Sequence, residues 1–439
     1  MNAVLPPRTW PLWLTLYALC GGCAETPQHT NAPHTEPVFT AELTDTLLLG
    51  NADNAEVVVW VPGVHRALLV SSKARKLTLL DPTTGALQIL AETALFPEDS
   101  SESELTNVAV HPDGSWAVLT RTRLLTDTKG AQIACEGELV FVDLSPGERF
   151  GKILSQIDVG AMPDSVAISD DGLRVASADE RDGAEAWGKC EVSGTEASIS
   201  IVDVQEGPTA PSLAATVWMV DDTTGPREPE DLSFSQDGER LLVTLQDSHE
   251  VLIVPVADAL KEGSMTSENL VILALPPNGL GALPWPDGIT RFQDATGAEH
   301  FAVAGEWNDT ILLLDGEGEV VLNLPVTPRD IPETLPRVED EGSPRFSPDS
   351  LTTFVHDQRA HIAVTLRHSG ALAIWDVSQP ELPIFCTTVA VGKSEMGGAN
   401  EEGSTIRPEG ITASPDGTWI LTANEEESSV SLVRGTSAD

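Results

Sequence analysis

The chain has few basic residues and only one tyrosine. Its 439 residues include 25 Lys and Arg against 68 Asp and Glu, which gives a formal net charge of −43. Binding to nucleic acid or to an anionic membrane by charge is disfavoured, because those surfaces are also negative. The single Tyr stands beside 10 Phe and 10 Trp, and hydrophobic residues make up 41% of the chain. This content is enough for a substantial core.

Several sequence patterns are also missing. There is no apolar run of about 18 residues, so we expect no helix that spans a bilayer in the mature chain. We find no G-x-S-x-G elbow, no Walker loop, no H-E-x-x-H pair and no EF-hand loop. The sequence therefore gives no motif-based reason to expect a serine hydrolase, a P-loop NTPase or a zinc protease.

The N-terminus has the pattern of an export signal. Arg8 precedes the apolar stretch "WPLWLTLYAL" (10–19), which is followed by "CGGC" (20–23). Small residues ahead of Cys23 resemble a bacterial lipobox, so we predict a signal peptide over 1–22 and lipidation of Cys23. The alternative is a plain secretory signal. Residues 23–37 are polar and Pro-rich and predict a flexible tether. We expect a protein of the bacterial cell envelope, lipid-anchored at the outer membrane. Whether it faces the periplasm or the exterior stays open.

The rest of the chain repeats one unit. "LTNVAVHPDGSWAVLT" begins a copy at residue 105, and later copies begin at positions 163, 229, 286, 348 and 408. A more divergent copy precedes them over 55–81, so the chain has seven copies, each of about 60 residues. Each copy holds apolar runs of strand length, separated by turns such as Asp171-Gly172. The only stretch with a helical pattern is 256–263.

Seven units of four antiparallel strands predict an all-β fold, a seven-bladed β-propeller over 38–434. The last copy ends after its third strand. Residues 38–50, "VFTAELTDTLLLG", alternate like a strand and precede the first copy. We predict that they supply the outer strand of the last blade, because that blade would otherwise expose an unpaired edge.

Four segments carry a resemblance to a known family. They are "VGAMPDSVAISDDGLRVASADE" (159–180), "PEDLSFSQDGERLLVTLQDSHEVLIV" (229–254), "HIAVTLRHSGALAIWDVSQPELP" (361–383) and "PEGITASPDGTWILTANEEESSVSLV" (408–433). These segments resemble the bacterial β-propeller family called choice-of-anchor I, related to mesenchyme-specific cell-surface glycoprotein-like proteins, and more loosely YVTN-type surface-layer repeats. The resemblance covers 50–433 and implies an exported, surface-attached propeller. It supplies no catalytic residues.

One position of the repeat predicts a binding site. An acidic residue directly precedes the first, innermost strand in five copies: Asp164, Glu230, Asp287, Asp349 and Glu409. Asn107 takes this place in the second copy. Because the innermost strands line the central channel, we expect these carboxyl groups to form a ring at one mouth. The ends of the second strands add further residues to the same face: Glu180, Gln246, Glu306, Arg367 and Glu425.

Two interpretations of this ring stay open. Repulsion among five carboxylates raises some pKa values unless a cation neutralises them, and Ca²⁺, which takes six to eight oxygen ligands, would suit such a site. Alternatively, each acid accepts N–H bonds from its own turn, or pairs with Arg367 or Arg407. No other cofactor is expected.

The cysteines and histidines give weaker signals. Cys135 and Cys190 lie in the segments 121–137 and 181–197, at equivalent positions of adjacent blades. An exported protein is oxidised, so we predict a disulfide between them. Cys386 is expected to be a small buried residue. His356, His361 and His368 lie close in sequence but are expected to point in different directions.

Three functions remain after these steps. The first is a monomeric binding module whose acidic, loop-rich face takes an envelope or extracellular protein, a glycan or a cation. The second is a lactonase-like hydrolase that uses the channel carboxylates. The third is a structural surface-layer component. The fold alone does not choose among them.

Overall fold

The computed structural model describes most of the chain from residue 39 onward. The described residues are 39–50, 54–97, 102–126, 132–180, 196–221, 226–336, 338–340, 343–393, 399–400 and 403–438. Cys23, Cys190 and the predicted signal peptide and tether lie outside these ranges. Within them, no helix is both long enough and apolar enough to cross a membrane.

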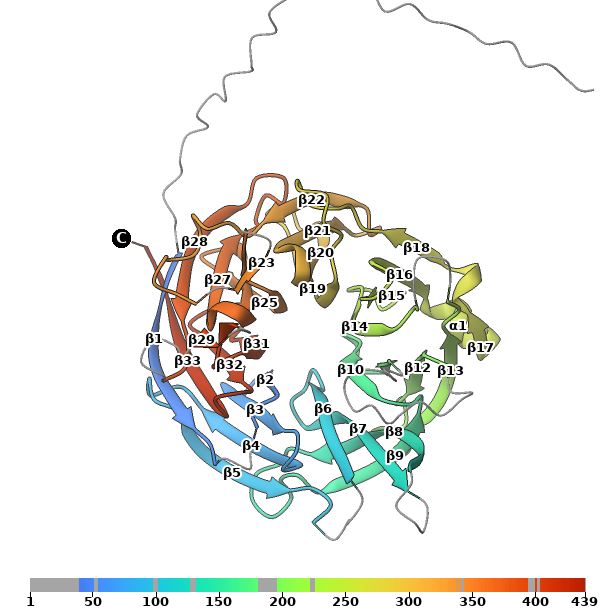
Figure 1. Cartoon of the computed structure of the whole chain (residues 1–439). Coiled ribbons are helices and arrows are strands. Elements are labelled where there is room, and N and C mark those ends of the chain that lie inside the picture. The colour runs from blue at the N-terminus through green and yellow to red at the C-terminus, as the bar shows by residue number, and fades with distance from the viewer. Residues whose placement is uncertain are drawn as a thin grey trace, which may run out of the picture. The chain divides into compact units, whose positions relative to one another are not determined.

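Seven antiparallel sheets surround a central channel (Figure 1), as the repeats predicted. Blade 1 consists of β2 (Val57–Val61), β3 (Arg66–Ser71), β4 (Lys76–Asp81) and β5 (Gln88–Ala94). Blade 2 consists of β6 (Glu102–Val110), β7 (Trp116–Thr126), β8 (Gln132–Asp143) and β9 (Ile153–Val159). Blade 3 consists of β10 (Pro163–Ile168), β11 (Arg174–Asp179), β12 (Ser198–Asp203) and β13 (Ser212–Trp218).

The other four blades follow the same order from the channel outward. Blade 4 consists of β14 (Pro229–Phe234), β15 (Arg240–Leu245), β16 (Glu250–Pro255) and β18 (Val271–Ala274), and blade 5 of β19 (Pro286–Gln293), β20 (Glu299–Gly305), β21 (Thr310–Asp315) and β22 (Val320–Pro325). Blade 6 consists of β25 (Pro348–His356), β26 (Arg359–Leu366), β27 (Ala371–Asp376) and β28 (Ile384–Ala390). Blade 7 consists of β31 (Pro408–Ala413), β32 (Trp419–Asn424), β33 (Ser429–Ser437) and β1 (Phe39–Leu48).

Burial explains why the middle strands are continuous apolar runs. The faces of each blade pack against neighbouring blades, so β15 and β16 are buried along almost their whole length. Outer strands such as β22 are mostly half-buried and alternate less clearly. Leu241, Val243 and Leu252 belong to one core cluster with Ile199 and Val217 of the preceding blade. The core is therefore a series of interfaces between blades, and no single central core exists in the described ring.

The last blade is closed by the N-terminal strand, as predicted. β1 pairs antiparallel with β33, from Phe39 opposite Ser437 to Leu48 opposite Ser429. The Phe39 ring is fully buried and lies about 5 Å from the rings of Phe354 and His361. The first and last strands thus share one sheet, and the edge of β33 is covered.

Some elements extend the blades. The expected helix is α1 (Val256–Glu262), and β17 (Ser264–Thr266) then pairs in parallel with β13, so blade 4 adds a fifth strand to blade 3. The described parts of segment 121–137 belong to β7 and β8, which pair antiparallel. The remaining elements are η1 (Ser267–Asn269), η2 (Glu306–Asn308), η3 (Arg367–Ser369), and the hairpins β23 (Val338–Asp340) with β24 (Ser343–Arg345) and β29 (Ala399–Asn400) with β30 (Gly403–Ser404).

The propeller has two faces with different connections. Turns between the first and second strands lie on one face, which we call the turn face. Loops that lead into the first strands and leave the second strands lie on the other, which we call the loop face. In Asp-Gly turns such as Asp237-Gly238, the glycine has φ near +69°, a conformation that favours glycine.

Candidate functional site: an acidic cavity at the channel mouth

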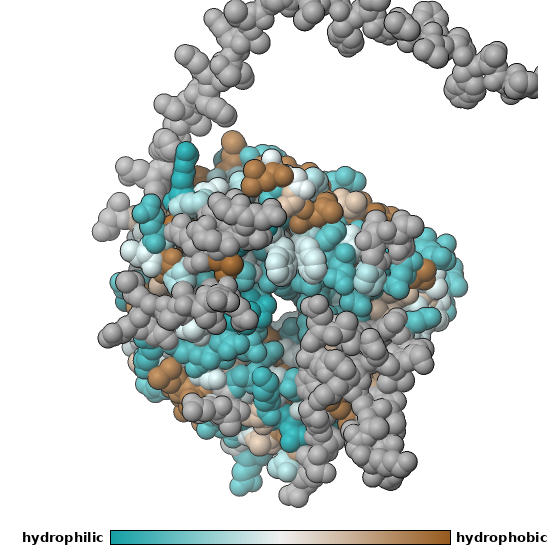
Figure 2. All heavy atoms as spheres, in the orientation of Figure 1, coloured by the Kyte–Doolittle hydropathy of each residue, from teal (hydrophilic) through white to brown (hydrophobic). Residues whose placement is uncertain are grey.

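A cavity of about 240 Å³ lies at the loop-face mouth of the channel. Seven carboxyl groups and one guanidinium line it: Glu56, Asp164, Glu230, Asp231, Asp287, Asp349, Glu409 and Arg367. Asn107 lines it as well, but the prediction that it takes the place of the five acids is wrong: its N–H donates to Thr120 as that of Asp231 donates to Thr244, so Asn107 has the position of Asp231. The five acids that share one repeat position thus lie around a single space, and Figure 2 shows hydrophilic residues around the central hollow of this face.

A β-bulge places each acid at the start of its strand. In blade 4, Pro229 pairs with Leu245, but the next paired residue is Leu232, so Glu230 and Asp231 bulge out of the ladder. The register shifts at the same position in blades 2, 3, 5, 6 and 7. A bulge changes the direction of a side chain and frees main-chain groups from the ladder. Repetition of this bulge directs the acids toward the channel.

Threonines of the second strands satisfy the freed main-chain groups. The hydroxyl of Thr244 accepts a hydrogen bond from the N–H of Asp231 at 2.9 Å and donates to the carbonyl of Asp287 in the next blade at 2.8 Å. Thr365 has the same role between Ser350 and the carbonyl of Glu409. The bulges of neighbouring blades are therefore linked, which fixes the spacing of the acids around the ring.

The acids of the cavity differ in how well they are satisfied. Asp231 accepts hydrogen bonds from Ser165 and from the N–H groups of Leu232 and Ile289, both at 2.8 Å. The side chains of Glu230 and Asp287 have no hydrogen-bond or ion-pair partner within the described ranges. Asp231 is therefore a structural link among blades 3, 4 and 5, whereas Glu230 and Asp287 present unsatisfied oxygens to the cavity.

Arg367 is the one basic residue that lines the described cavity. Its guanidinium forms ion pairs with Glu306 at 3.7 Å, with Asp349 at 3.6 Å and with Glu409 at shorter range. Arg407, the other predicted counter-charge, pairs with Glu426 instead. Among the described cavity acids, this guanidinium pairs with Asp349 and Glu409 and leaves Glu230 and Asp287 without an ion pair.

The pKa values of the cavity carboxyl groups are raised. Burial raises the pKa of Glu56 to about 8, and repulsion from Glu425 and Asp164 adds to this effect. Burial also raises the pKa of Asp349 to about 7, against the opposing effect of Arg367. For Glu230 burial and repulsion from Glu180 act together and place its pKa well above the usual value.

Two further cavity acids, Asp287 and Glu409, show the same direction. Burial, and then Asp349, raise the pKa of Asp287 well above its usual value. Burial raises the pKa of Glu409 likewise, although Arg367 opposes it. Glu56, whose pKa is about 8, holds a proton at neutral pH, and a cation would displace it by favouring the charged form.

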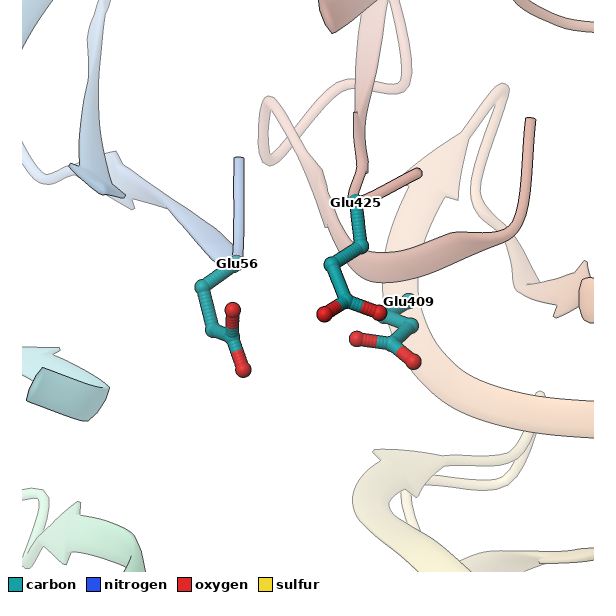
Figure 3. Close-up of side chains that lie close together, drawn as sticks. All are labelled: Glu56, Glu409 and Glu425. Atoms are coloured by element: carbon teal, nitrogen blue, oxygen red, sulfur yellow. The ribbon is translucent and has the colours of Figure 1, made fainter. Parts of the chain in front are cut away.

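One group of three carboxylates has the spacing of a metal site. Each of Glu56, Glu409 and Glu425 offers an oxygen within 4.8 Å of the others, and Figure 3 shows Glu409 and Glu425 side by side opposite Glu56. Of the five acids predicted for calcium, only Glu409 belongs to this group. The oxygen-only set matches the ligand preference of Ca²⁺, although three ligand atoms are fewer than the six to eight it takes.

The other predicted residues are placed as follows. Glu306 and Glu425 lie beside the cavity at the ends of β20 and β32, and Glu180 lies near enough to Glu230 to affect its pKa. Cys135 is disulfide-bonded, while its predicted partner Cys190 is outside the described ranges. Cys386 is a buried free thiol, and burial raises its pKa to about 12.

The three histidines do not share one site. The rings of His356 and His361 lie 6.4 Å apart and both pack against Phe39 of the closing strand. His368 lies in η3, beside Arg367. The first two therefore support the junction between blade 6 and β1.

Sequence analysis missed Glu56 and Asp231. Glu56 stands directly before β2, the first strand of blade 1, so it has the same repeat position as the five predicted acids. No proline precedes it, and the first copy is divergent, which hid the equivalence. Aligning the first strands by their apolar residues would have found it.

Together, the ring of four-stranded sheets and the cavity define a seven-bladed β-propeller with an acidic axial mouth. Residues 56–222 match the family described as "Choice-of-anchor I domain", which suggests a cell-surface protein. This match covers blades 1 to 3, a shorter range than the 50–433 of the resemblance seen in the sequence.

The structural comparison gives the fold alone. The chain is similar to a solved structure titled "Kuenenia stuttgartiensis Hydrazine Synthase", with a TM-score of 0.55 and 14% sequence identity over 88% of this chain and 96% of that chain. A comparison with curated proteins found no match. At such low identity the similarity says nothing about activity.

Proposed function

We propose that this protein is an exported, surface-attached binding module whose acidic cavity takes a positively charged group. The observation that carries the proposal is that Glu230 and Asp287, both half-buried in a cavity lined by a single guanidinium, have no hydrogen bond or ion pair to their side chains within the described residues. Taking an unpaired carboxylate out of water is costly, so such groups are normally paired. A cation supplied by a ligand would remove this cost.

The test compares cations with matched variants. Melting of the purified full-length protein is followed while CaCl₂, lysine amide or spermidine is added against NaCl at equal ionic strength. We expect at least one of these cations to raise the melting temperature. Glu230→Gln combined with Asp287→Asn should abolish the shift, because these changes remove charge without breaking any described contact. Glu381→Gln, at an exposed site outside the cavity, is the control.

Two outcomes would overturn the proposal. One is a wild-type protein whose melting and metal content respond to none of the three cations. The other is a shift that persists in the double variant. A response to Ca²⁺ alone that is lost in Glu56→Gln would place the metal at Glu56, Glu409 and Glu425, and a response to the organic cations would place an ammonium group in the cavity.

One observation favours a hydrolase as a second candidate. Burial raises the pKa of Glu56 to about 8, so this carboxyl group is protonated at neutral pH, beside the charged groups of the cavity. A general acid works best when its pKa is close to the working pH. A panel of lactones and esters tests this candidate, and turnover that Glu56→Gln abolishes and Glu381→Gln leaves intact would support it. Absence of turnover across the panel would count against it.

Attachment to the envelope is the other part of the proposal, and it rests on the sequence around Cys23 and on the Choice-of-anchor I match. Expression of the full chain in a bacterium with a labelled fatty acid tests it. We expect label on the wild type and none on Cys23→Ala. A wild type that is exported without label would indicate a plain secretory signal.

A further inference from the structure

An apolar surface lies on the loop face next to the acidic cavity. It consists of Leu280, Leu283, Trp285 and Trp307, which we call the aromatic platform. Leu280 is 86% exposed, Trp307 51% and Leu283 47%. The rings of Trp285 and Trp307 lie 5.7 Å apart. Figure 2 shows hydrophobic residues gathered above the central hollow, over blade 5.

The platform is held in a fixed conformation. The side-chain oxygen of Asn278 accepts hydrogen bonds from the N–H groups of Leu280 and Ala282 at 2.9 and 3.0 Å. The amide of Asn278 donates to the carbonyl of Asn308 in η2 at 3.0 Å. Leu280 is thus presented at the tip of an ordered turn. A single exposed leucine is ordinary, but Leu280 and Leu283 are both exposed in the segment that leads to Trp285, and Trp285 contacts the exposed Trp307, so the apolar exposure here is concentrated in one region.

The platform and the cavity are parts of one surface. Trp285 is two residues before Asp287, and Trp307 directly follows Glu306, which pairs with Arg367. The N–H of Glu306 donates to the carbonyl of Trp285 at 2.9 Å, which joins the two segments. Apolar side chains and partnerless carboxylates therefore lie beside each other on the loop face of blade 5.

We infer that the partner is a polypeptide segment in which basic side chains lie next to apolar ones. The inference rests on the proposed function, because the basic group would enter the cavity. The apolar side chains would pack on Leu280 and Trp307. A metal ion alone would leave the platform unused, and a neutral glycan would stack on the tryptophans but leave the carboxylates unpaired. Charge complementarity to the carboxyl groups of Glu230 and Asp287 thus favours the basic peptide.

The experiment uses four fluorescent probes and the full-length protein. The first is a glycine-spaced peptide of lysine and leucine. In the second serine replaces leucine, in the third glutamate replaces lysine, and the fourth is a chitin oligosaccharide. Binding is measured by fluorescence anisotropy at fixed ionic strength. We expect the lysine-leucine peptide to bind more tightly than the other three.

Variants separate the two parts of the surface. Leu280→Ser and Trp307→Ala should each weaken binding of the lysine-leucine peptide about tenfold and hardly affect the lysine-serine peptide, since a central apolar contact carries that much binding energy. Asp287→Asn should weaken both lysine peptides. Leu382→Ser is the matched control, because Leu382 is also a strongly exposed leucine, at 70%, but leads into the outer strand β28.

The outcomes distinguish the two proposals. Asp287→Asn could weaken binding of both lysine peptides while Leu280→Ser and Trp307→Ala weaken it no more than the control Leu382→Ser does. In that case this inference fails and the cation-binding function stands. If neither lysine peptide binds, or Asp287→Asn has no effect on them, this inference fails, and the melting response to the three cations alone decides the cation-binding function. If the oligosaccharide binds tightly and Trp307→Ala abolishes this binding, the partner is a glycan and the inference of a peptide partner fails.

Discussion

The two faces of the propeller use the same residue types in opposite ways. On the turn face, Asp237 accepts hydrogen bonds from the hydroxyl of Ser235 at 2.7 Å and from the N–H of Glu239 at 3.0 Å, and these bonds lower its pKa. Asp81 at the end of β4 is likewise lowered, first by the hydroxyl of Thr83. On the loop face, burial raises the pKa of Glu230 and Asp287, which have no such partners in the described structure.

This difference separates structural acids from candidate binding acids. A carboxylate that its own turn satisfies stabilises the fold and has little left to offer a ligand. A buried carboxylate without a donor makes the fold less stable at neutral pH, so a ligand is the natural source of its missing charge. Acidity of the whole chain is therefore a poor guide to function, and the partners of each acid are a better one.

Of the changes considered, deleting residues 38–50 should lower the free energy of unfolding most. The loop-face cavity depends on this segment too, because the cavity exists only in a closed ring. The deletion removes β1, exposes the edge of β33 and leaves the pocket around Phe39 empty. The loss should be comparable to the total stability of a domain, about 5 to 15 kcal/mol. Thermal unfolding followed by circular dichroism is expected to lose its cooperative transition.

A deletion of the same kind in the predicted tether, residues 24–36, is the control and should leave the transition unchanged. A protein that lacks 38–50 and still melts like the wild type would show that the ring does not need this strand.

Gly410→Ala should disturb the acids of the loop face and leave the turn face intact. A Cβ at this position would lie 2.7 Å from the carbonyl oxygen of Glu56 and 2.8 Å from the Cα of Val57. Both are main-chain atoms, so blade 7 must move away from blade 1, at a cost of about 1 to 3 kcal/mol. Urea denaturation measures it. Gly279→Ala, where nothing lies within 4 Å of the added Cβ, should be nearly neutral.

Asp237→Ala tests the turn-face half of the comparison. It removes two hydrogen bonds and should destabilise the protein by about 1 to 2 kcal/mol. The matched change on the loop face, Asp287→Asn, removes no described side-chain bond and should be neutral or stabilising at pH 8. Both are compared by urea denaturation. A loss for Asp287→Asn as large as that for Asp237→Ala would mean that the two faces do not differ as described.

The fold followed from the sequence because each blade repeats the same local signals. Apolar runs separated by Asp-Gly turns define hairpins without any distant contact, and seven copies leave few other architectures. The closing strand was predictable too, since the last copy lacks a fourth strand and residues 38–50 have the right alternation. The pairing of β17 with β13 was not, because a three-residue strand after a helix carries no pattern of its own.

The candidate site was only partly predictable. Repeat position is a local property, so Asp164, Glu230, Asp287, Asp349 and Glu409 could be grouped from sequence. Which acids have partners depends on neighbouring blades: Asp231 is satisfied by Ser165 and Ile289, while the adjacent Glu230 is not. The aromatic platform escaped notice for the same reason, because Asn278 joins the turn that carries Leu280 to Asn308, the neighbour of Trp307, through bonds that the sequence does not show.

Glu56→Gln should produce the smallest change of all near pH 4, and a difference that grows as the pH rises. The pKa of Glu56 rises from about 4.5 to about 8 on folding. Between these values the folded protein holds a proton that the unfolded chain has released, so the stability of the wild type falls as pH rises through this window. Glutamine removes the titration. The variant should match the wild type near pH 4 and exceed it by about 4 kcal/mol at pH 8, because each pKa unit is worth about 1.4 kcal/mol.

Urea denaturation at pH 4, 6 and 8 measures this difference, with Glu381→Gln as the control. A bound cation should reverse the sign, because it favours the ionised form of Glu56 and the wild type would then be the more stable protein at pH 8. A difference that is flat with pH would mean that Glu56 is ionised in the cavity throughout, and that the loop-face acids are as well satisfied as those of the turn face.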